Sequence, residues 1–187
     1  MIGFAQVSLG ILAGGQGRRL GSVDKSAQVF EGRSLLQRTL NAFPQPFAER
    51  LLSYNRTPDA RHAGLRCVAD LRPDCPGPLA GLEAMSQACS SKWLLTVPVD
   101  CRGFPEDLAD ALLAQTAGEG AVVRDADGLQ PLLGLWRTRE LRIAVAEAFA
   151  RNELSVQRMQ AALTLRELNI APHRLGNLNS PDDFAAG

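Results

Sequence analysis

The chain has 187 residues, the size of one domain, and 45% hydrophobic residues are enough to bury a core. Twenty Lys and Arg balance twenty Asp and Glu, so the basic excess expected of a nucleic-acid-binding protein is absent. No run of about 20 apolar residues is present, which excludes a membrane-spanning helix. These properties indicate a protein without a nucleic-acid or membrane partner.

The opening stretch and the cysteines indicate the compartment. "MIGFAQVSLGILAGG" lacks a basic segment, and its apolar run leads directly into glycines, so we expect a first strand rather than a signal peptide. The cysteines form no C-x-x-C pair, which argues against a zinc site and favours reduced thiols in a cytoplasmic protein. The cysteines are Cys67, Cys75, Cys89 and Cys101, and the two histidines, predicted to lie at the surface, are His62 and His173.

Short apolar runs alternate with longer segments of helical period along the first half of the chain. A strand is expected over 7–13, followed by a glycine-rich loop and then a helix over 34–43, with Ser34 as its N-cap and Pro44 ending it. Strands over 49–55 and 65–70 come next. A helix over 78–91 begins with Pro78 in its first turn, and a buried strand over 92–100 follows it.

The second half continues the alternation with a helix over 105–117, strands over 120–125 and 129–137, and helices over 138–150 and 154–162. A strand over 164–170 and a short helix beginning near Ser180 complete the chain. Strands separated by helices predict an α/β fold with a mostly parallel sheet and helices on both faces. In such sheets ligands bind at the carboxyl ends of the strands, where the glycine loop, Asn55, Asp70 and Asp100 are placed.

The segment "LGILAGGQGRRLGSVDKS" (9–26) has the composition of an anion-binding loop. It is not a Walker loop, because Lys25 follows Asp24 instead of glycine, and its glycine spacing is one residue too long for a dinucleotide fingerprint. Glycines still let backbone N–H groups point at phosphate oxygens, and the cations add charge-assisted hydrogen bonds. A glycine-rich turn with solvated basic residues is the alternative. The residues concerned are Gly14, Gly15, Gly17, Arg18, Arg19, Gly21 and Lys25.

Asp100 ends the apolar strand "WLLTVPVD", so its carboxylate is expected to face the same crevice as the loop. One or two carboxylates together with phosphate oxygens and water are the usual ligands of Mg²⁺. An aspartate that caps the following turn is the alternative. Asp70 has a similar alternative, because "DLRPDCPGP" is rich in turn-forming residues.

These segments resemble, in order, the motifs of the molybdenum cofactor guanylyltransferases, the MobA family. "LAGGQGRRLGSVDKS" resembles its L-A-G-G-x-[GA]-x-R-[ML]-G-x-x-D-K signature, and "DLRPDCPGPLAGL" resembles its D-x(n)-G-P-L-A-G segment. "VPVDCRGFP", "LQPLLGLW" and "NLNSPDDF" resemble three later segments. The resemblance covers nearly the whole chain and implies a single Rossmann-like nucleotidyltransferase domain over 1–187, with a nucleotide half at about 1–100 and a second-substrate half at about 101–187.

The family implies transfer of GMP from GTP to the terminal phosphate of molybdopterin, with Mg²⁺ and release of pyrophosphate, and exchange of the cofactor with delivery and acceptor proteins. The resemblance implies catalytic roles for Arg19, Lys25 and Asp100, with Asp100 holding the metal. The implied nucleotide contacts are Leu12, Ala13, Gly14, Gly15, Lys25, Ser53, Asn55, Asp70 and Asp100. The family's closing motif places Asn177, Asn179 and Asp182 near the second substrate.

Three positions depart from the family's pattern. Ser53 stands where the family commonly has an asparagine, and a hydroxyl cannot make the same pair of hydrogen bonds. Gln130 stands where the family has a histidine, which removes any imidazole role, and Arg158 is a loosely aligned substitute for a family arginine.

Other functions remain compatible with the same residues. A molybdopterin cytidylyltransferase or a sugar- or polyol-phosphate nucleotidyltransferase would use the same loop and Asp100, although "LAGG" and Asp70 favour guanine. A non-catalytic nucleotide-binding paralogue is disfavoured because Lys25 and Asp100 are both retained. A purely structural domain is disfavoured because several polar positions converge on one edge of the sheet.

Overall fold

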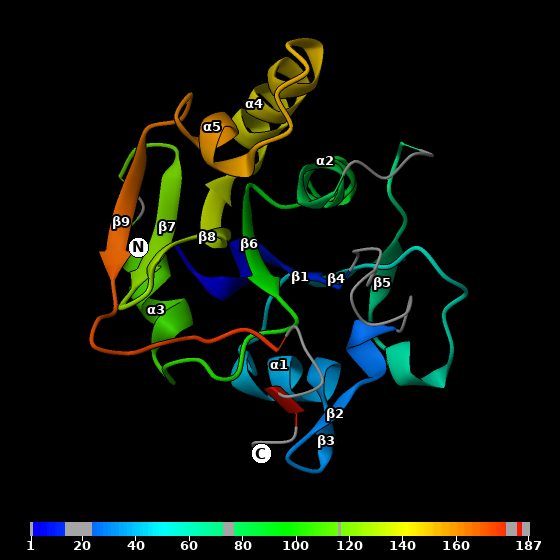
Figure 1. The fold of residues 1–187 in the computed structure, drawn as a ribbon. Helices are drawn as coiled ribbons and strands as arrows, with labels where there is room; N and C mark the ends of the chain where they lie inside the picture. Colours follow the sequence, from blue (N-terminus) through cyan, green and yellow to red (C-terminus); the bar gives the residue numbers. More distant parts are fainter. Residues whose placement is uncertain (1, 14–23, 73–76, 116, 179–182, 185–187) are drawn as a thin grey trace.

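The computed structural model describes residues 2–13, 24–72, 77–115, 117–178 and 183–184, and all structural statements refer to these ranges. A seven-stranded sheet has the order β5-β4-β1-β6-β8-β7-β9 (Figure 1). Every pairing is parallel except those of β8, which runs antiparallel to both β6 and β7. The predicted mostly parallel α/β sheet is confirmed. The strands are β1 (Val7–Leu12), β4 (Glu49–Ser53), β5 (Arg66–Val68), β6 (Trp93–Pro98), β7 (Gly120–Asp125), β8 (Gly128–Arg137) and β9 (Leu165–Asn169).

Helices cover both faces of the sheet, as predicted. One face carries α2 (Pro78–Ala88), α4 (Thr138–Ala150) and α5 (Val156–Gln160), and the other carries α1 (Leu35–Ala42) and α3 (Leu108–Ala114) (Figure 1). Successive strand residues point to opposite faces, so Leu51 joins the core beneath α2 and α4 while Leu52 joins the core beneath α1 and α3. The apolar runs of the central strands are therefore buried on both sides.

Local sequence signals explain where the helices begin and how closely they approach the sheet. Ser34 caps α1 as predicted, and Gln37 completes a capping box with it. Pro78 opens α2, directly after Gly77 with its φ of 95°. Gly10 of β1 leaves room for its neighbours, because a Cβ there would lie 3.1 Å from Leu94 Cδ1 of β6 and 3.5 Å from Met85 Sδ of α2. None of these helices is both long and apolar enough to cross a membrane.

Some features were not predicted from the sequence. A two-stranded hairpin joins β2 (Val29–Phe30) to β3 (Arg33–Ser34). Short 3₁₀ helices within the described ranges are η1 (Phe4–Gln6), η3 (Lys25–Ala27) and η4 (Ala60–His62). The surface prediction for His62 is wrong: the residue is 3% exposed, and its Nδ1 accepts a hydrogen bond from the Asp59 backbone N–H at 3.0 Å. A lone histidine carries no periodic signal, so its burial came from tertiary contacts. His173 is partly buried, and the predicted helix near Ser180 lies mainly outside the described residues.

Candidate active site

Four parallel strands bring the predicted polar residues to one edge of the sheet. Because β5, β4, β1 and β6 are adjacent and parallel, their carboxyl ends meet there. Ala13 follows β1, Asn55 follows β4 and Asp70 follows β5, while Asp100 follows β6. The polar residues predicted from the sequence therefore meet at this edge, which is the usual place of the binding crevice in an open α/β sheet.

Lys25 and Asp100 form an ion pair at the centre of this edge. The distance from Lys25 Nζ to Asp100 Oδ2 is 2.7 Å, although the residues are 75 positions apart. Lys25 opens η3, and Asp100 lies in the turn after β6. Their side chains are 20% and 19% exposed, so both charges remain accessible to a ligand while the nearby protein weakens solvent screening.

Asp24, the residue before Lys25, ties this turn to the segment after β4. Its carboxylate accepts hydrogen bonds from the Ser26 backbone N–H at 2.9 Å and the Ser26 hydroxyl at 2.5 Å. The Tyr54 hydroxyl donates a third hydrogen bond at 2.8 Å. Burial acts to raise the pKa of Asp24, but the hydrogen bonds from Ser26 and Tyr54 outweigh it and lower the pKa below its ordinary value. Asp24 is therefore held as a carboxylate.

Asn55 and Asp70 form a second polar pair at the same edge. Asn55 Nδ2 donates to Asp70 Oδ2 at 2.8 Å, and the Asp70 backbone N–H donates to Asn55 Oδ1 at 2.8 Å. This reciprocal arrangement orients the carboxamide and ties Asp70, which follows β5, to the segment that follows β4. The structure thus brings together two residues that the sequence analysis assigned separately to a nucleotide site.

Ser53 lies beneath this edge, in the core. It is 1% exposed, and its Oγ has no hydrogen-bond partner among the described residues. It faces α2, because a Cβ added to Gly81 would lie 3.4 Å from Ser53 Oγ and 3.4 Å from Leu12 Cδ2. Leu12 is 9% exposed and Ala13 is partly exposed, so Ala13 is the most accessible of the three.

The C-terminal segment returns to the turn that carries Asp100. The Leu178 backbone N–H donates to the Asp100 carbonyl at 2.8 Å, and Cys101 forms an antiparallel bridge with Asn177. Asn177 is thereby brought next to the edge of the sheet that carries Asp100. Burial, with the nearby Asp100 and Asp125 carboxylates, raises the pKa of the Cys101 thiol, which favours its protonated form.

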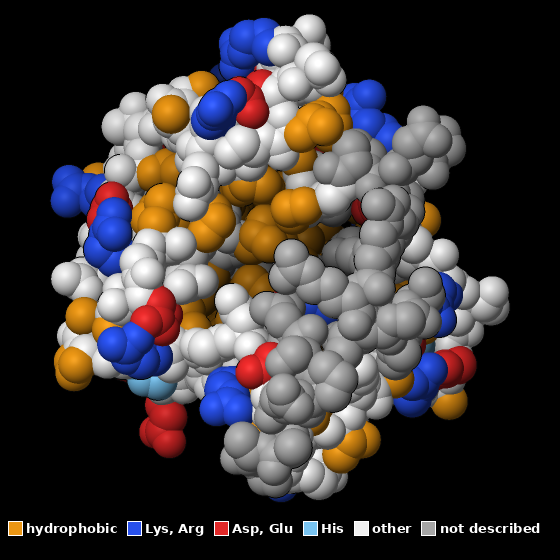
Figure 2. Space-filling model, in the orientation of Figure 1, with side chains coloured by type: hydrophobic (Ala, Val, Ile, Leu, Met, Phe, Trp, Pro, Cys, Tyr) orange, Lys and Arg blue, Asp and Glu red, His pale blue; other side chains and the backbone are white. Residues whose placement is uncertain are grey.

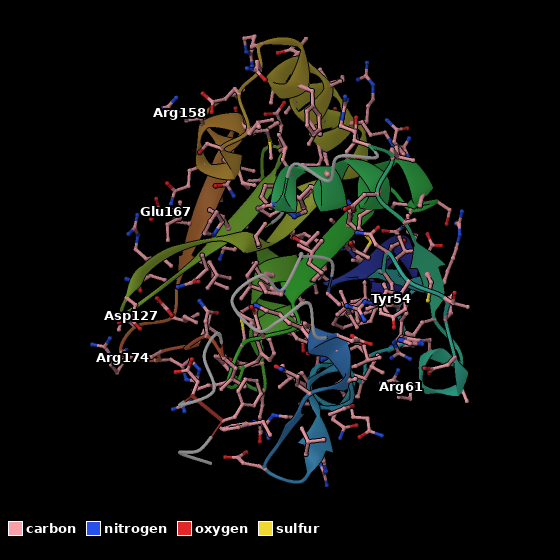
Figure 3. All side chains as sticks on the ribbon, turned by 45° about the vertical axis from the view of Figure 1, so that its right-hand side comes forward. Tyr54, Arg61, Asp127, Arg158, Glu167 and Arg174 are labelled. Carbon is pink, nitrogen blue, oxygen red and sulfur yellow. The ribbon has the colours of Figure 1, made fainter. Side chains whose placement is uncertain are left out.

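The two other departures from the family pattern have structural partners. Gln130 Nε2 donates to the buried Asp125 carboxylate at 3.0 Å, within the β7–β8 hairpin. Arg158 pairs with Glu153 at 2.9 Å on the outside of α5, well away from Tyr54 (Figure 3). The predicted residues Gly14, Gly15, Arg19, Asn179 and Asp182 lie outside the described part of the chain.

Sequence reasoning did not identify the roles of Asp24 and Tyr54. The position of Asp24 directly before Lys25 in the motif could have suggested a role for it. Its hydrogen-bond partner Tyr54 could not be identified in this way, because it is 30 positions away. On the same face of the molecule, hydrophobic side chains gather in a hollow over β6 and β8, between α2 and α5 (Figure 2). The polar edge therefore adjoins an apolar surface.

A mostly parallel α/β sheet with polar side chains gathered at its carboxyl edge is an architecture shared by many nucleotide-binding proteins. The sequence model of one protein family, the MobA-like NTP transferase domain, matches residues 9–167 of this chain. The chain therefore belongs to this family. The resemblance found in the sequence is thus confirmed.

Curated relatives agree with this assignment, and a solved structure shares the fold. The chain is 39% identical over 135 residues to the molybdenum cofactor guanylyltransferase of Bordetella pertussis, and the aligned region covers 68% of each chain. It is 30% identical over 184 residues to that of Vibrio atlanticus, which covers 96% of this chain and 94% of the relative. Molybdopterin-guanine dinucleotide biosynthesis protein A from Archaeoglobus fulgidus superimposes with a TM-score of 0.74 at 18% identity, covering 96% and 95% of the two chains.

Proposed function

We propose that this protein transfers GMP from GTP to the terminal phosphate of molybdopterin, with release of pyrophosphate, to form the guanine dinucleotide cofactor. The relatives named molybdenum cofactor guanylyltransferase support this reaction, and one of them matches nearly the whole chain. The structural observation that carries the proposal is the Lys25–Asp100 pair at the carboxyl edge of the sheet. It offers one cation for a triphosphate and one carboxylate for a divalent metal.

The residues of this chain act by positioning and by electrostatics. Lys25, with Arg19, neutralises the charge that builds up on the departing pyrophosphate. Leu12, Ala13, Gly14 and Gly15 contact the nucleotide through the glycine loop. The attacking phosphate is already ionised, so the reaction needs no general base.

The guanine end of the nucleotide is proposed to lie near the reciprocal pair of Asn55 and Asp70. A carboxylate that is already oriented by a carboxamide is suited to accept hydrogen bonds from guanine N–H groups. Ser53 retains a proposed supporting contact from the family pattern, although its hydroxyl must become accessible to make it.

The donor set at Asp100 fits Mg²⁺. This ion favours oxygen ligands and is usually held by one or two carboxylates plus substrate phosphates and water. Asp100 supplies one carboxylate, and no cluster of three or more His, Cys, Asp or Glu ligands is found in the described ranges. Such a site would therefore depend on the triphosphate for its remaining ligands. When bound, the ion would neutralise charge on the phosphates.

The second half of the chain, residues 101–187, is proposed to receive molybdopterin. Asn177 lies beside the turn of Asp100, and the apolar hollow lies near the same edge. Asn179 and Asp182 follow Asn177 closely in the sequence. We place the protein in the cytoplasm, with delivery and acceptor proteins handling the labile cofactor.

The chain offers a matched pair of variants to test nucleotide binding, because its two lysines lie at opposite edges of the sheet. Lys25 is at the carboxyl edge, and the exposed Lys92 precedes the first residue of β6. In calorimetric titrations with GTP, CTP, ATP and UTP in Mg²⁺, we expect selective GTP binding. Lys25→Ala should weaken it by roughly 10- to 100-fold, because a hydrogen bond to a charged group is lost. Lys92→Ala should bind GTP as the wild type does.

Each outcome of these titrations bears on the proposal. Selective CTP binding would assign the chain to a cytidylyltransferase, and no nucleotide binding would contradict an enzymatic role. Equal effects of the two lysine substitutions would remove Lys25 from the site. The reaction itself is checked by pyrophosphate release from GTP, which should require added molybdopterin.

A further inference from the structure

One carboxylate connects the turn of Lys25 to the segment that follows β4. Asp24 Oδ1 accepts both hydrogen bonds from Ser26, within the Lys25 turn. Asp24 Oδ2 accepts the hydrogen bond from the Tyr54 hydroxyl, and the Arg61 guanidinium lies 3.7 Å from the same oxygen. The carboxylate therefore binds its own turn with one oxygen and a distant part of the chain with the other.

Tyr54 is itself held rigidly, so its hydroxyl is aimed at Asp24 before any ligand binds. Its side chain is buried, and its backbone N–H donates to the Val68 carbonyl at 2.8 Å. Its ring packs on that of His62, with the ring centroids 4.4 Å apart. His62 is fixed in turn by the hydrogen bond from the Asp59 backbone. This packing accounts for the burial of His62.

The turn of Lys25 has little structure of its own. The η3 helix is three residues long, and its two backbone hydrogen bonds, which join Ala27 to Asp24 and Gln28 to Lys25, measure 3.2 Å each. So short a helix has negligible intrinsic stability. The shorter, charge-assisted bond from Tyr54 to Asp24 is a stronger restraint on this turn.

The two residues of this bond are sequence neighbours of the two polar pairs. Asp24 precedes Lys25, which pairs with Asp100, and Tyr54 precedes Asn55, which pairs with Asp70. We propose that Tyr54 is a positioning residue: through Asp24 it sets the place of Lys25 relative to the Asn55–Asp70 pair. The bond thereby fixes the spacing between the groups for the triphosphate and those for the base of a bound nucleoside triphosphate. Tyr54 and Arg61 lie on the same side of the molecule, toward β4 and η4 (Figure 3).

This inference rests on the proposed nucleotide site, and Tyr54→Phe tests it by removing one hydroxyl. Ser8→Ala is the matched control, because it also removes a buried hydroxyl that donates to a carboxylate at 2.8 Å, namely Glu49. Ser8 lies at the start of β1, far from the carboxyl edge. We expect Tyr54→Phe to weaken GTP binding about tenfold, and Ser8→Ala to leave it unchanged.

A double-mutant cycle separates positioning from a general loss of stability. If Tyr54 acts through Lys25, adding Tyr54→Phe to Lys25→Ala should change GTP affinity by less than twofold. An equal tenfold loss in both backgrounds, or no loss in either, would overturn the inference. Tyr54→Phe and Ser8→Ala should lower the free energy of unfolding to a similar degree. If Tyr54 affected GTP binding only through stability, Ser8→Ala would therefore weaken GTP binding as well.

Failure of the inference is distinguishable from failure of the proposed function. If the wild-type protein binds no nucleotide, the proposed function fails, and the role of Tyr54 in it fails too. If the wild type binds GTP and Lys25→Ala weakens that binding, the function stands, and the cycle alone decides the role of Tyr54.

Discussion

Replacing Asp100 with Asn is expected to change nucleotide affinity in opposite directions with and without magnesium. In the metal-free protein the Asp100 carboxylate pairs with Lys25 and repels the triphosphate that Lys25 would bind. An uncharged asparagine at this position removes the repulsion. It also competes less strongly than the carboxylate with the triphosphate for Lys25. With magnesium present, the same substitution removes the carboxylate proposed to hold the ion, so the ion can no longer strengthen binding.

The magnitude follows from the geometry of the pair. A phosphate oxygen hydrogen-bonded to Lys25 Nζ lies within about 5.5 Å of Asp100 Oδ2, because the ion pair measures 2.7 Å. At an effective dielectric constant of ~20, two unit charges at that separation repel by about 3 kcal/mol. Because the two side chains are about one-fifth exposed, salt screens part of this repulsion, and about 1–2 kcal/mol of it remains. Metal-free GTP should therefore bind Asp100→Asn about 5- to 30-fold more tightly.

Calorimetry with GTP in EDTA, and then in excess magnesium, measures both effects. Asp127→Asn is the matched control, since Asp127 is half exposed and pairs with Arg174 at the β7–β8 turn, on the opposite side of the molecule from Tyr54 (Figure 3). It should bind as the wild type does in both buffers. If Asp100→Asn binds no more tightly in EDTA and keeps the wild-type gain from magnesium, Asp100 neither faces the triphosphate nor holds the metal.

Two further predictions concern stability. Burial acts to raise the pKa of Glu49, but hydrogen bonds from Ser90 and Ser8 lower it below 4.5, so the carboxylate stabilises the fold above that pH and loses this effect as the pH falls through its lower folded-state pKa. Glu49→Gln should flatten the decline in unfolding free energy between about pH 5 and 3, and an unchanged acid decline would contradict this. Gly134→Ala would place a Cβ 2.6 Å from the Ala121 carbonyl oxygen and should cost about 1–3 kcal/mol in urea unfolding. Gly103→Ala, with open space around its Cβ, should stay within about 0.5 kcal/mol, and equal costs would show that the backbone relaxes freely.

Most of the secondary structure could be predicted because its signals are local. The buried strand β6 is a continuous apolar run, and α1 begins at a Ser34 cap that needs no distant partner. The antiparallel direction of β8 could not be predicted, since the order of strands depends on packing between distant segments. The hairpin of β2 and β3 was missed because two-residue strands show no periodicity. Its turn at Glu31 and Gly32, both with positive φ, was a weak signal.

The edge of the sheet that carries the polar residues was predictable, whereas the contacts between them were not. Asp100 and Asp70 each come at the carboxyl end of a predicted strand, so a general rule for α/β sheets placed both. That Lys25 meets Asp100, or that Asn55 meets Asp70, depends on how loops fold back over the sheet. Ser53 shows the limit of transfer from a family motif, because the position alone did not reveal that its hydroxyl is turned into the core.

The bond from Leu178 to the Asp100 carbonyl has a consequence for the order of events during synthesis. Lys25 and Asp100 leave the ribosome long before residue 178, so the turn of Asp100 gains this hydrogen bond only after a further 78 residues have been made. Contacts over such separations form late, because much loop entropy must be lost first. A nascent chain can thus assemble the strands β1, β4, β5 and β6 while the turn of Asp100 still lacks this hydrogen bond, and the proposed site is complete only after residue 178 has been made.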